Sequence, residues 1–186
     1  MKNKTKIALA IILTAIISAT GTYAAFLLAY RINTTLVVKP VVSMNVYEPD
    51  GVTPLTSIDM GQFQRGTAKY FPGGLDVGLE IKPTEYYYIK NEDEQSFYIE
   101  FAWSNLPWVG SPTLFIFVKR GDQATFVELV AETGTRYNLP IMTRLDDPDP
   151  AKQYAIWYFA FPILETIPFG SYAPTLTINA YSTATG

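Results

Sequence analysis

Apolar and polar residues alternate along the chain from Thr35 onward with a period of two, not with the 3.6-residue period of an amphipathic helix. Alternation of this kind is typical of strands with one buried face. The clearest alternating runs are 42–46, 77–81, 97–103 and 175–181. Two further runs, 114–118 and 154–161, are apolar at almost every position. They predict central strands, or strands whose second face lies in a subunit contact.

Turn-forming residues separate these runs, as in the Pro-Asp-Gly of 49–51 and the Phe-Pro-Gly-Gly of 71–74. After position 35 the only helical candidate is the weak pattern at Thr125–Glu132. About eight to ten short strands with frequent turns indicate two packed sheets. The predicted fold is all-β: a single jelly-roll or immunoglobulin-like β-sandwich, preceded by an N-terminal hydrophobic export segment.

The export segment occupies the first 30 residues. Three lysines lie within the first six residues, and an uncharged apolar run follows at 7–19. Small residues at positions 22 and 24 predict signal cleavage between Ala24 and Ala25. The charge-free stretch nevertheless continues to Tyr30, which makes it long enough to span a bilayer as an uncleaved anchor with its lysine-rich end inside. Both alternatives export residues 31–186 to the outside of the cell.

The resulting organisation has three parts. Residues 1–24 form a signal peptide, or an anchor that extends to residue 30. Residues 25–38 form an N-terminal extension, and residues 39–186 form the sandwich. If cleavage occurs, the new N-terminus is an apolar segment that needs a partner surface in water.

Composition excludes most catalytic chemistry. The chain has no cysteine and no histidine, so it has no disulfide, no thiolate or imidazole metal site and no nucleophile activated by histidine. After three of the 14 basic residues are assigned to the leader, 11 remain against 17 acidic residues, without a basic cluster for nucleic acid. We therefore expect a protein that is not an enzyme, uses no cofactor and does not bind nucleic acid.

Several short motifs resemble the TasA/camelysin class of matrix-fibre subunits. They are the Ala-Ala-Phe at 24–26 followed by an extended segment, the glycine-bounded turn at 59–66, the Lys-Asn turn at 90–91, and the closing run 169–182. The last of these is similar to the final strand of archaeal members such as the bundling pilins. Arg65 stands where the family usually has proline.

This resemblance implies a structural subunit of an extracellular filament, such as a pilus or biofilm matrix fibre. In such filaments the N-terminal extension of one subunit fills the incomplete sheet of the next, which is donor-strand complementation. The implied partner is another copy of the chain, with lateral bundling of filaments as a further contact. The membrane is then a partner only before cleavage or through a retained anchor. The residues expected to form the donor strand are Phe26, Leu28, Tyr30, Leu36 and Val38.

Other functions remain open from the sequence. A retained anchor would make the chain a membrane-anchored accessory or binding domain, or a type IV pilin-like subunit. Trp108, between Pro107 and Val109, is the tryptophan most suited to carbohydrate binding, whereas Trp103 and Trp157 fit the core pattern.

Two polar motifs each have a functional and a non-functional interpretation. Asn33-Thr34-Thr35 is a glycosylation sequon, and such three-residue matches are frequent by chance. Asp146, Asp147 and Asp149 lie in a proline-rich loop and can either be solvated or contribute to a calcium site.

Overall fold

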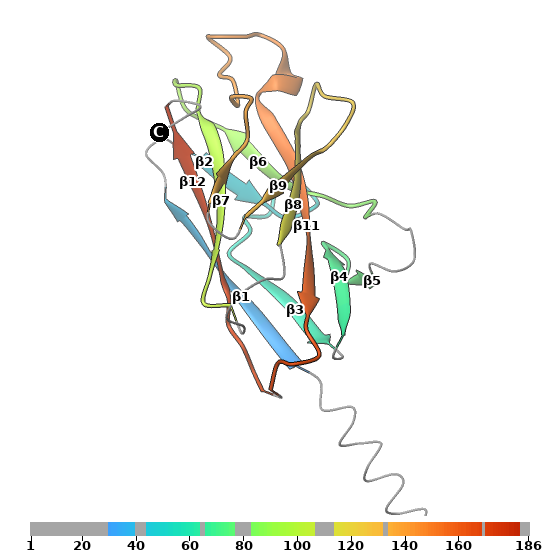
Figure 1. Ribbon diagram of the computed structural model, residues 1–186. Coiled ribbons are helices and arrows are strands. Elements are labelled where there is room, and N and C mark those ends of the chain that lie inside the picture. The colour runs from blue at the N-terminus through green and yellow to red at the C-terminus, as the bar shows by residue number, and fades with distance from the viewer. Residues whose placement is uncertain are drawn as a thin grey trace, which may run out of the picture.

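The computed structural model describes residues 30–39, 44–63, 66–76, 83–106, 114–131, 134–168 and 170–182. These residues form strands and one short 3-10 helix, η2 (Pro150–Lys152), and they contain no α-helix. The strands build two sheets that pack face to face (Figure 1). The predicted all-β fold and its β-sandwich character are therefore confirmed.

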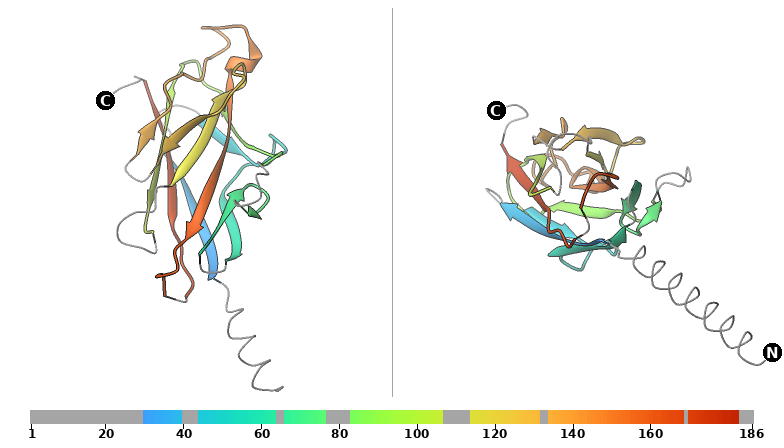
Figure 2. Two further views of the ribbon diagram at one scale, coloured as in Figure 1. Left: turned by 45° about the vertical axis from the view of Figure 1, so that its right-hand side comes forward. Right: turned by 60° about the horizontal axis from the view of Figure 1, so that its bottom comes forward.

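The first sheet, sheet A, brings the two ends of the described chain together. Its strands are, in spatial order, β10 (Thr135–Arg136), β7 (Tyr98–Ser104), β12 (Thr175–Tyr181), β1 (Tyr30–Lys39) and β3 (Ser57–Phe63). β1 runs parallel to β12, and the other pairs in sheet A are antiparallel. β1, in blue, and β12, in red, lie side by side in both views of Figure 2.

The second sheet, sheet B, is organised around its longest strand, β11 (Tyr154–Ile163). Two strands follow each other along one edge of β11, and a third lines the opposite edge. These are β6 (Tyr87–Asn91), β4 (Thr67–Phe71) and β8 (Phe115–Arg120). Three outer strands complete the sheet: β2 (Met44–Tyr47) beside β6, β5 (Leu75–Asp76) beside β4, and β9 (Val127–Val130) beside β8.

Aromatic side chains from the two sheets fill the space between the layers. The ring of Trp103 in β7 lies 5.4 Å from that of Phe159 and 5.3 Å from that of Phe161, both in β11. Phe101 of β7 lies 5.3 Å from Trp157 of β11. Such pairs bury large apolar areas and add their own ring–ring attraction. They explain why alternate residues of these strands are aromatic.

The strand predictions for 97–103, 114–118, 154–161 and 175–181 are confirmed, and the run at 42–46 corresponds to β2. The run at 77–81 lies outside the described residues. The helical candidate at Thr125–Glu132 is wrong, because the segment contains β9, which pairs with β8. Its two valines favour an extended backbone, and the edge of β8 offers hydrogen bonds that an isolated helical turn lacks.

Candidate assembly site

β1 lies in the interior of sheet A although it is the first strand of the described chain (Figure 1). Residues 30–35 pair with β3, and residues 35–39 pair with β12. The first half of β1 is therefore held by one neighbour and the second half by the other. Without β1, backbone groups would be left unpaired along both β3 and β12, which is an opening for a strand from elsewhere.

An extra residue in β3 changes the register opposite the start of β1. Ile32 pairs with Gly61 and Asn33 with Asp59, so Met60 is left without a partner in β1. Gly61 has a φ of +65°, in the left-handed region that glycine adopts without steric cost, and its N–H donates to Asp59 Oδ1 at 2.9 Å. The bulge allows Met60 and Phe63, three positions apart, both to face the core.

The inward face of β1 contributes both an apolar and a polar side chain to the core. Leu36 is buried and in register with the buried Leu176 of β12. Thr34 is only 1% exposed, and its Oγ1 has no hydrogen-bond partner among the described residues. A buried hydroxyl without a partner loses its hydration and gains nothing in return. The fit of β1 in sheet A is therefore less than optimal at Thr34.

We expect Thr34→Val to raise the free energy of unfolding by about 1 kcal/mol, since the near-isosteric valine removes the unsatisfied hydroxyl. Urea unfolding followed by tryptophan fluorescence measures this change. Thr177→Val is the matched control, because Thr177 lies on the opposite, outward face of β12. We expect the control to change stability by less than about 0.5 kcal/mol. Equal effects of the two substitutions would contradict the assignment.

The residues predicted for assembly fall on both sides of the boundary of the described chain. Ala24, Ala25, Phe26 and Leu28 lie outside the described residues. Tyr30, Leu36 and Val38 all belong to β1, where their register partners are Phe63, Leu176 and Ile178. The sequon residue Asn33 also lies in β1, with its backbone paired to Asp59.

Besides a donor strand or an anchor, a strand paired within its own chain was a third interpretation of this segment, and residues 30–39 have that pairing. The predicted boundary between extension and sandwich lies between residues 38 and 39, whereas β1 is continuous through Lys39. The run Leu36-Val37-Val38 was the available signal. β-branched residues favour strands wherever an edge is offered, including one formed by the same chain.

A second surface feature is an aromatic cluster on the outward side of sheet B, the outer aromatic face. It consists of Tyr70, Tyr86, Phe117, Phe126 and Tyr158. Tyr158 is at the centre and only 1% exposed, although its side chain points away from the core between the sheets. Burial raises the pKa of Tyr158 to about 12, with smaller contributions from nearby Tyr70, Tyr86 and Glu128. This face corresponds to the prediction that 154–161 is apolar on both sides.

The outward side of sheet A has a different character. Glu100 of β7 accepts hydrogen bonds from Asn179 Nδ2 at 3.1 Å and from the Tyr181 hydroxyl at 3.0 Å. Arg136 Nε lies 3.5 Å from a carboxylate oxygen of Glu100, and its guanidinium stacks over the Tyr181 ring. These charged and hydrogen-bonding side chains are therefore paired with one another within the chain.

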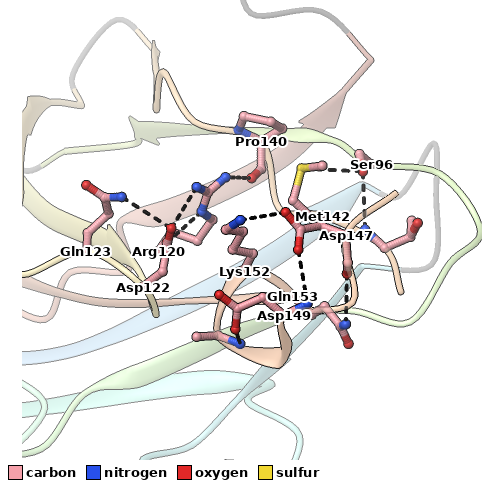
Figure 3. A network of polar contacts seen from close by, with 12 residues as sticks. Ser96, Arg120, Asp122, Gln123, Pro140, Met142, Asp147, Asp149, Lys152 and Gln153 are labelled. Carbon is pink, nitrogen blue, oxygen red and sulfur yellow. Dashed lines mark hydrogen bonds and ion pairs between the residues drawn. The ribbon is translucent and has the colours of Figure 1, made fainter. Parts of the chain in front are cut away.

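A network of polar contacts fastens the loops at the end of the sandwich where β8 finishes (Figure 3). Arg120 is nearly buried and donates from Nε to Asp122 Oδ1 at 2.7 Å and from Nη1 to the Pro140 carbonyl at 3.0 Å. Its backbone N–H donates to the Tyr137 hydroxyl at 2.8 Å. The hydrogen bonds from Arg120 hold the pKa of Asp122 below its usual value. The network holds the end of β8 to the loops around Asp122 and Pro140, which is a structural role.

The acidic loop considered as a calcium site is engaged by donors of the same chain. Asp147 pairs with Lys152, and Asp146 accepts a hydrogen bond from Ser96 Oγ. Asp149 accepts the N–H of Ala151 at 3.0 Å and so caps η2. Within the described residues no three acidic side chains are grouped closely enough to hold a metal ion.

The tryptophans predicted to pack in the core do so: Trp103 is 4% exposed and Trp157 is fully buried. Trp108, the candidate for carbohydrate binding, lies outside the described residues.

The chain matches no protein-family model, and no curated protein is significantly similar to it in sequence. Within the described part of the chain, no helix has the length and apolar character needed to cross a bilayer.

Proposed function

We propose that this protein is the structural subunit of an extracellular filament that polymerises by exchange of β1, and that it is not an enzyme. The observation that carries the proposal is the position of β1, the most N-terminal strand described, between β12 and β3 in the interior of sheet A. A strand in this position completes the sheet, and all the other described strands follow it in the chain.

The exchanging unit is a single strand. β1 belongs to sheet A and the next strand, β2, to sheet B, so only the link of residues 40–43 joins β1 to the rest of the sandwich. β1 can therefore be exchanged as one strand, and its departure leaves β12 and β3 unpaired along the same edges until another strand takes its place. An identical strand from a second copy restores the same hydrogen bonds and the same buried Leu36. Exchange of an identical element in this way is a low-cost route to association.

Exchange of this kind makes polymers when each chain gives β1 to one neighbour and receives it from another. Such a contact is head-to-tail, and it propagates unless the rotation between subunits closes a ring. The single chain, with β1 in its own sheet, is then the self-complemented form. Since both forms contain the same strand pairs, the concentration of the chain sets the balance between them.

The location and the lack of catalysis belong to the same proposal. The lysine-rich start and the apolar run of the first 30 residues support export, and the motifs that resemble TasA/camelysin subunits support a matrix-fibre role. The lack of histidine and cysteine in the whole chain is consistent with a structural rather than a catalytic role. Lateral bundling of such filaments is a further proposed contact.

A synthetic peptide with the β1 sequence, residues 30–39, tests the proposal. Added in excess to full-length chain under assembling conditions, the peptide is expected to occupy open sheets and stop filament growth, with filament length falling as its concentration rises. Electron microscopy and sedimentation measure the filaments. A scrambled peptide of the same composition is the control. Filaments that grow equally with both peptides at saturating concentration would contradict strand exchange.

A further inference from the structure

The outer aromatic face consists of aromatic rings, whereas the outward side of sheet A carries charged side chains that are paired with each other. On sheet A, Glu100 and Arg136 pair with each other and with their neighbours. On sheet B, half-buried rings surround Tyr158, and Val130 of the edge strand β9 is 42% exposed. Grouped aromatic side chains on the outside of a sheet mark an interaction surface more often than a solvated one.

The orientation of the rings favours a protein partner over a polysaccharide. A sugar chain stacks on rings that lie in one plane, and in this cluster only Phe117 and Tyr158 are close to parallel, at 11°. Tyr70 and Phe126 meet the ring of Tyr158 at 72° and 77°. A surface of tilted rings is uneven, and it fits side chains that insert between the rings better than it fits a flat sugar chain.

Two charged residues beside the rings make the surface complementary to itself. Glu128 of β9 is directly opposite Phe117 in the strand register, and Lys119 lies two residues beyond Phe117 on β8. Neither has an ion-pair partner among the described residues, and the Lys119 ammonium lies 5.1 Å from the centre of the Phe126 ring. They are diagonal neighbours on adjacent strands, about 7–8 Å apart along the sheet, and in the single chain they form no ion pair with each other.

We propose that the outer aromatic face binds the same face of a second copy of this chain about a two-fold axis. In such a contact residue i of one copy meets residue j of the other, and the reverse pair forms at the same time. Lys119 of each copy then faces Glu128 of the other, and the rings around Tyr158 are covered from outside. Two sheets stacked in this way lie about 10 Å apart, as sheets in a sandwich do. The contact is separate from β1 and does not depend on strand exchange.

Charge reversal at these two positions tests the contact. In full-length chain, Lys119→Glu leaves both positions acidic and Glu128→Lys leaves both basic, so each single variant repels its own copy. We expect each to weaken self-association by at least about tenfold, as measured by sedimentation equilibrium at low salt. The two single variants mixed in equal amounts, and the double variant Lys119→Glu/Glu128→Lys, each restore opposite charges across the axis and are expected to recover the association.

Recovery of self-association in the mixed and double variants distinguishes the proposed contact from a loss of folding. Both residues are outside the core between the sheets, so circular dichroism of the variants should match that of the parent chain. Association that the single variants leave unchanged, or that mixing does not recover, would overturn the proposed contact; binding of a soluble glucan that competes with association would point to a sugar surface instead. Filament growth through β1 is expected in all the variants, so loss of filaments in every chain, the parent included, would instead count against strand exchange.

Discussion

A chain carrying Thr35→Cys and Ser57→Cys is expected to stop forming filaments when it is oxidised before assembly. Thr35 of β1 and Ser57 of β3 are register partners in sheet A. Cβ atoms of such partners are about 4.5–5.5 Å apart, close to the roughly 3.5–4.5 Å of a disulfide. The bond would fix β1 in its own sheet, and because exchange needs β1 to leave, filament yield should fall at least about tenfold.

The same two cysteines give the opposite result when oxidation follows assembly. In the proposed filament, β1 of one chain would lie beside β3 of the next, so oxidation should join the chains into a ladder of covalent multimers on non-reducing gels. The parent chain has no cysteine, so no other disulfide interferes. Reduction should restore assembly in the first case and return single chains in the second.

The matched control is the pair Thr177→Cys and Ala102→Cys, which joins β12 to β7. Neither strand moves in the proposed exchange, so this disulfide should form within one chain before and after assembly and leave filament yield unchanged. If the disulfide between positions 35 and 57 forms within single chains of intact filaments, the filaments do not use β1.

Trp157→Ala is expected to lower the free energy of unfolding by about 3–5 kcal/mol, because it leaves a large cavity between the sheets. The Trp157 ring is fully buried and lies 4.9 Å from Tyr87 and 5.3 Å from Phe101. It therefore joins β11 to both β6 and β7. A loss of this size is a large part of the stability of a typical domain, about 5–15 kcal/mol. Urea unfolding monitored by circular dichroism measures it.

Trp157→Phe distinguishes lost volume from lost polarity. The indole Nε1 of Trp157 is buried without a hydrogen-bond partner among the described residues, so its removal costs no hydrogen bond. The phenyl ring keeps most of the contacts, and we expect less than about half the loss caused by alanine. If the two variants were equally unstable, the contribution of Trp157 would not come from filling this space.

The alternation of apolar residues was sufficient to predict the sandwich and five of its strands, β2, β7, β8, β11 and β12. It also predicted the second apolar side of β11, where Tyr158 is buried on the outward face. It did not reveal that the rings covering Tyr158 come from two strands and two loops, because Tyr70 and Phe126 are far apart in sequence and each is unremarkable in its own segment.

Two further features depend on tertiary pairing that a single sequence does not display. The segment at 125–132 contains a strand only because the edge of β8 is available to it. The segment at 30–39 has the composition of a free donor strand and of an internal strand alike. Only the register with β12 and β3 shows that its own chain has a place for it.

The parallel pairing of β1 with β12 has a consequence for the order in which the protein can form. Synthesis proceeds from the N-terminus, so the first strand made must wait for the last, at residues 175–181, before the second half of β1 gains its neighbour. Contacts between the two ends of a chain are the slowest to form. During this interval the second half of β1 lacks a neighbour, and in the proposed assembly an open sheet at a filament end would compete with the chain's own C-terminal strand for it.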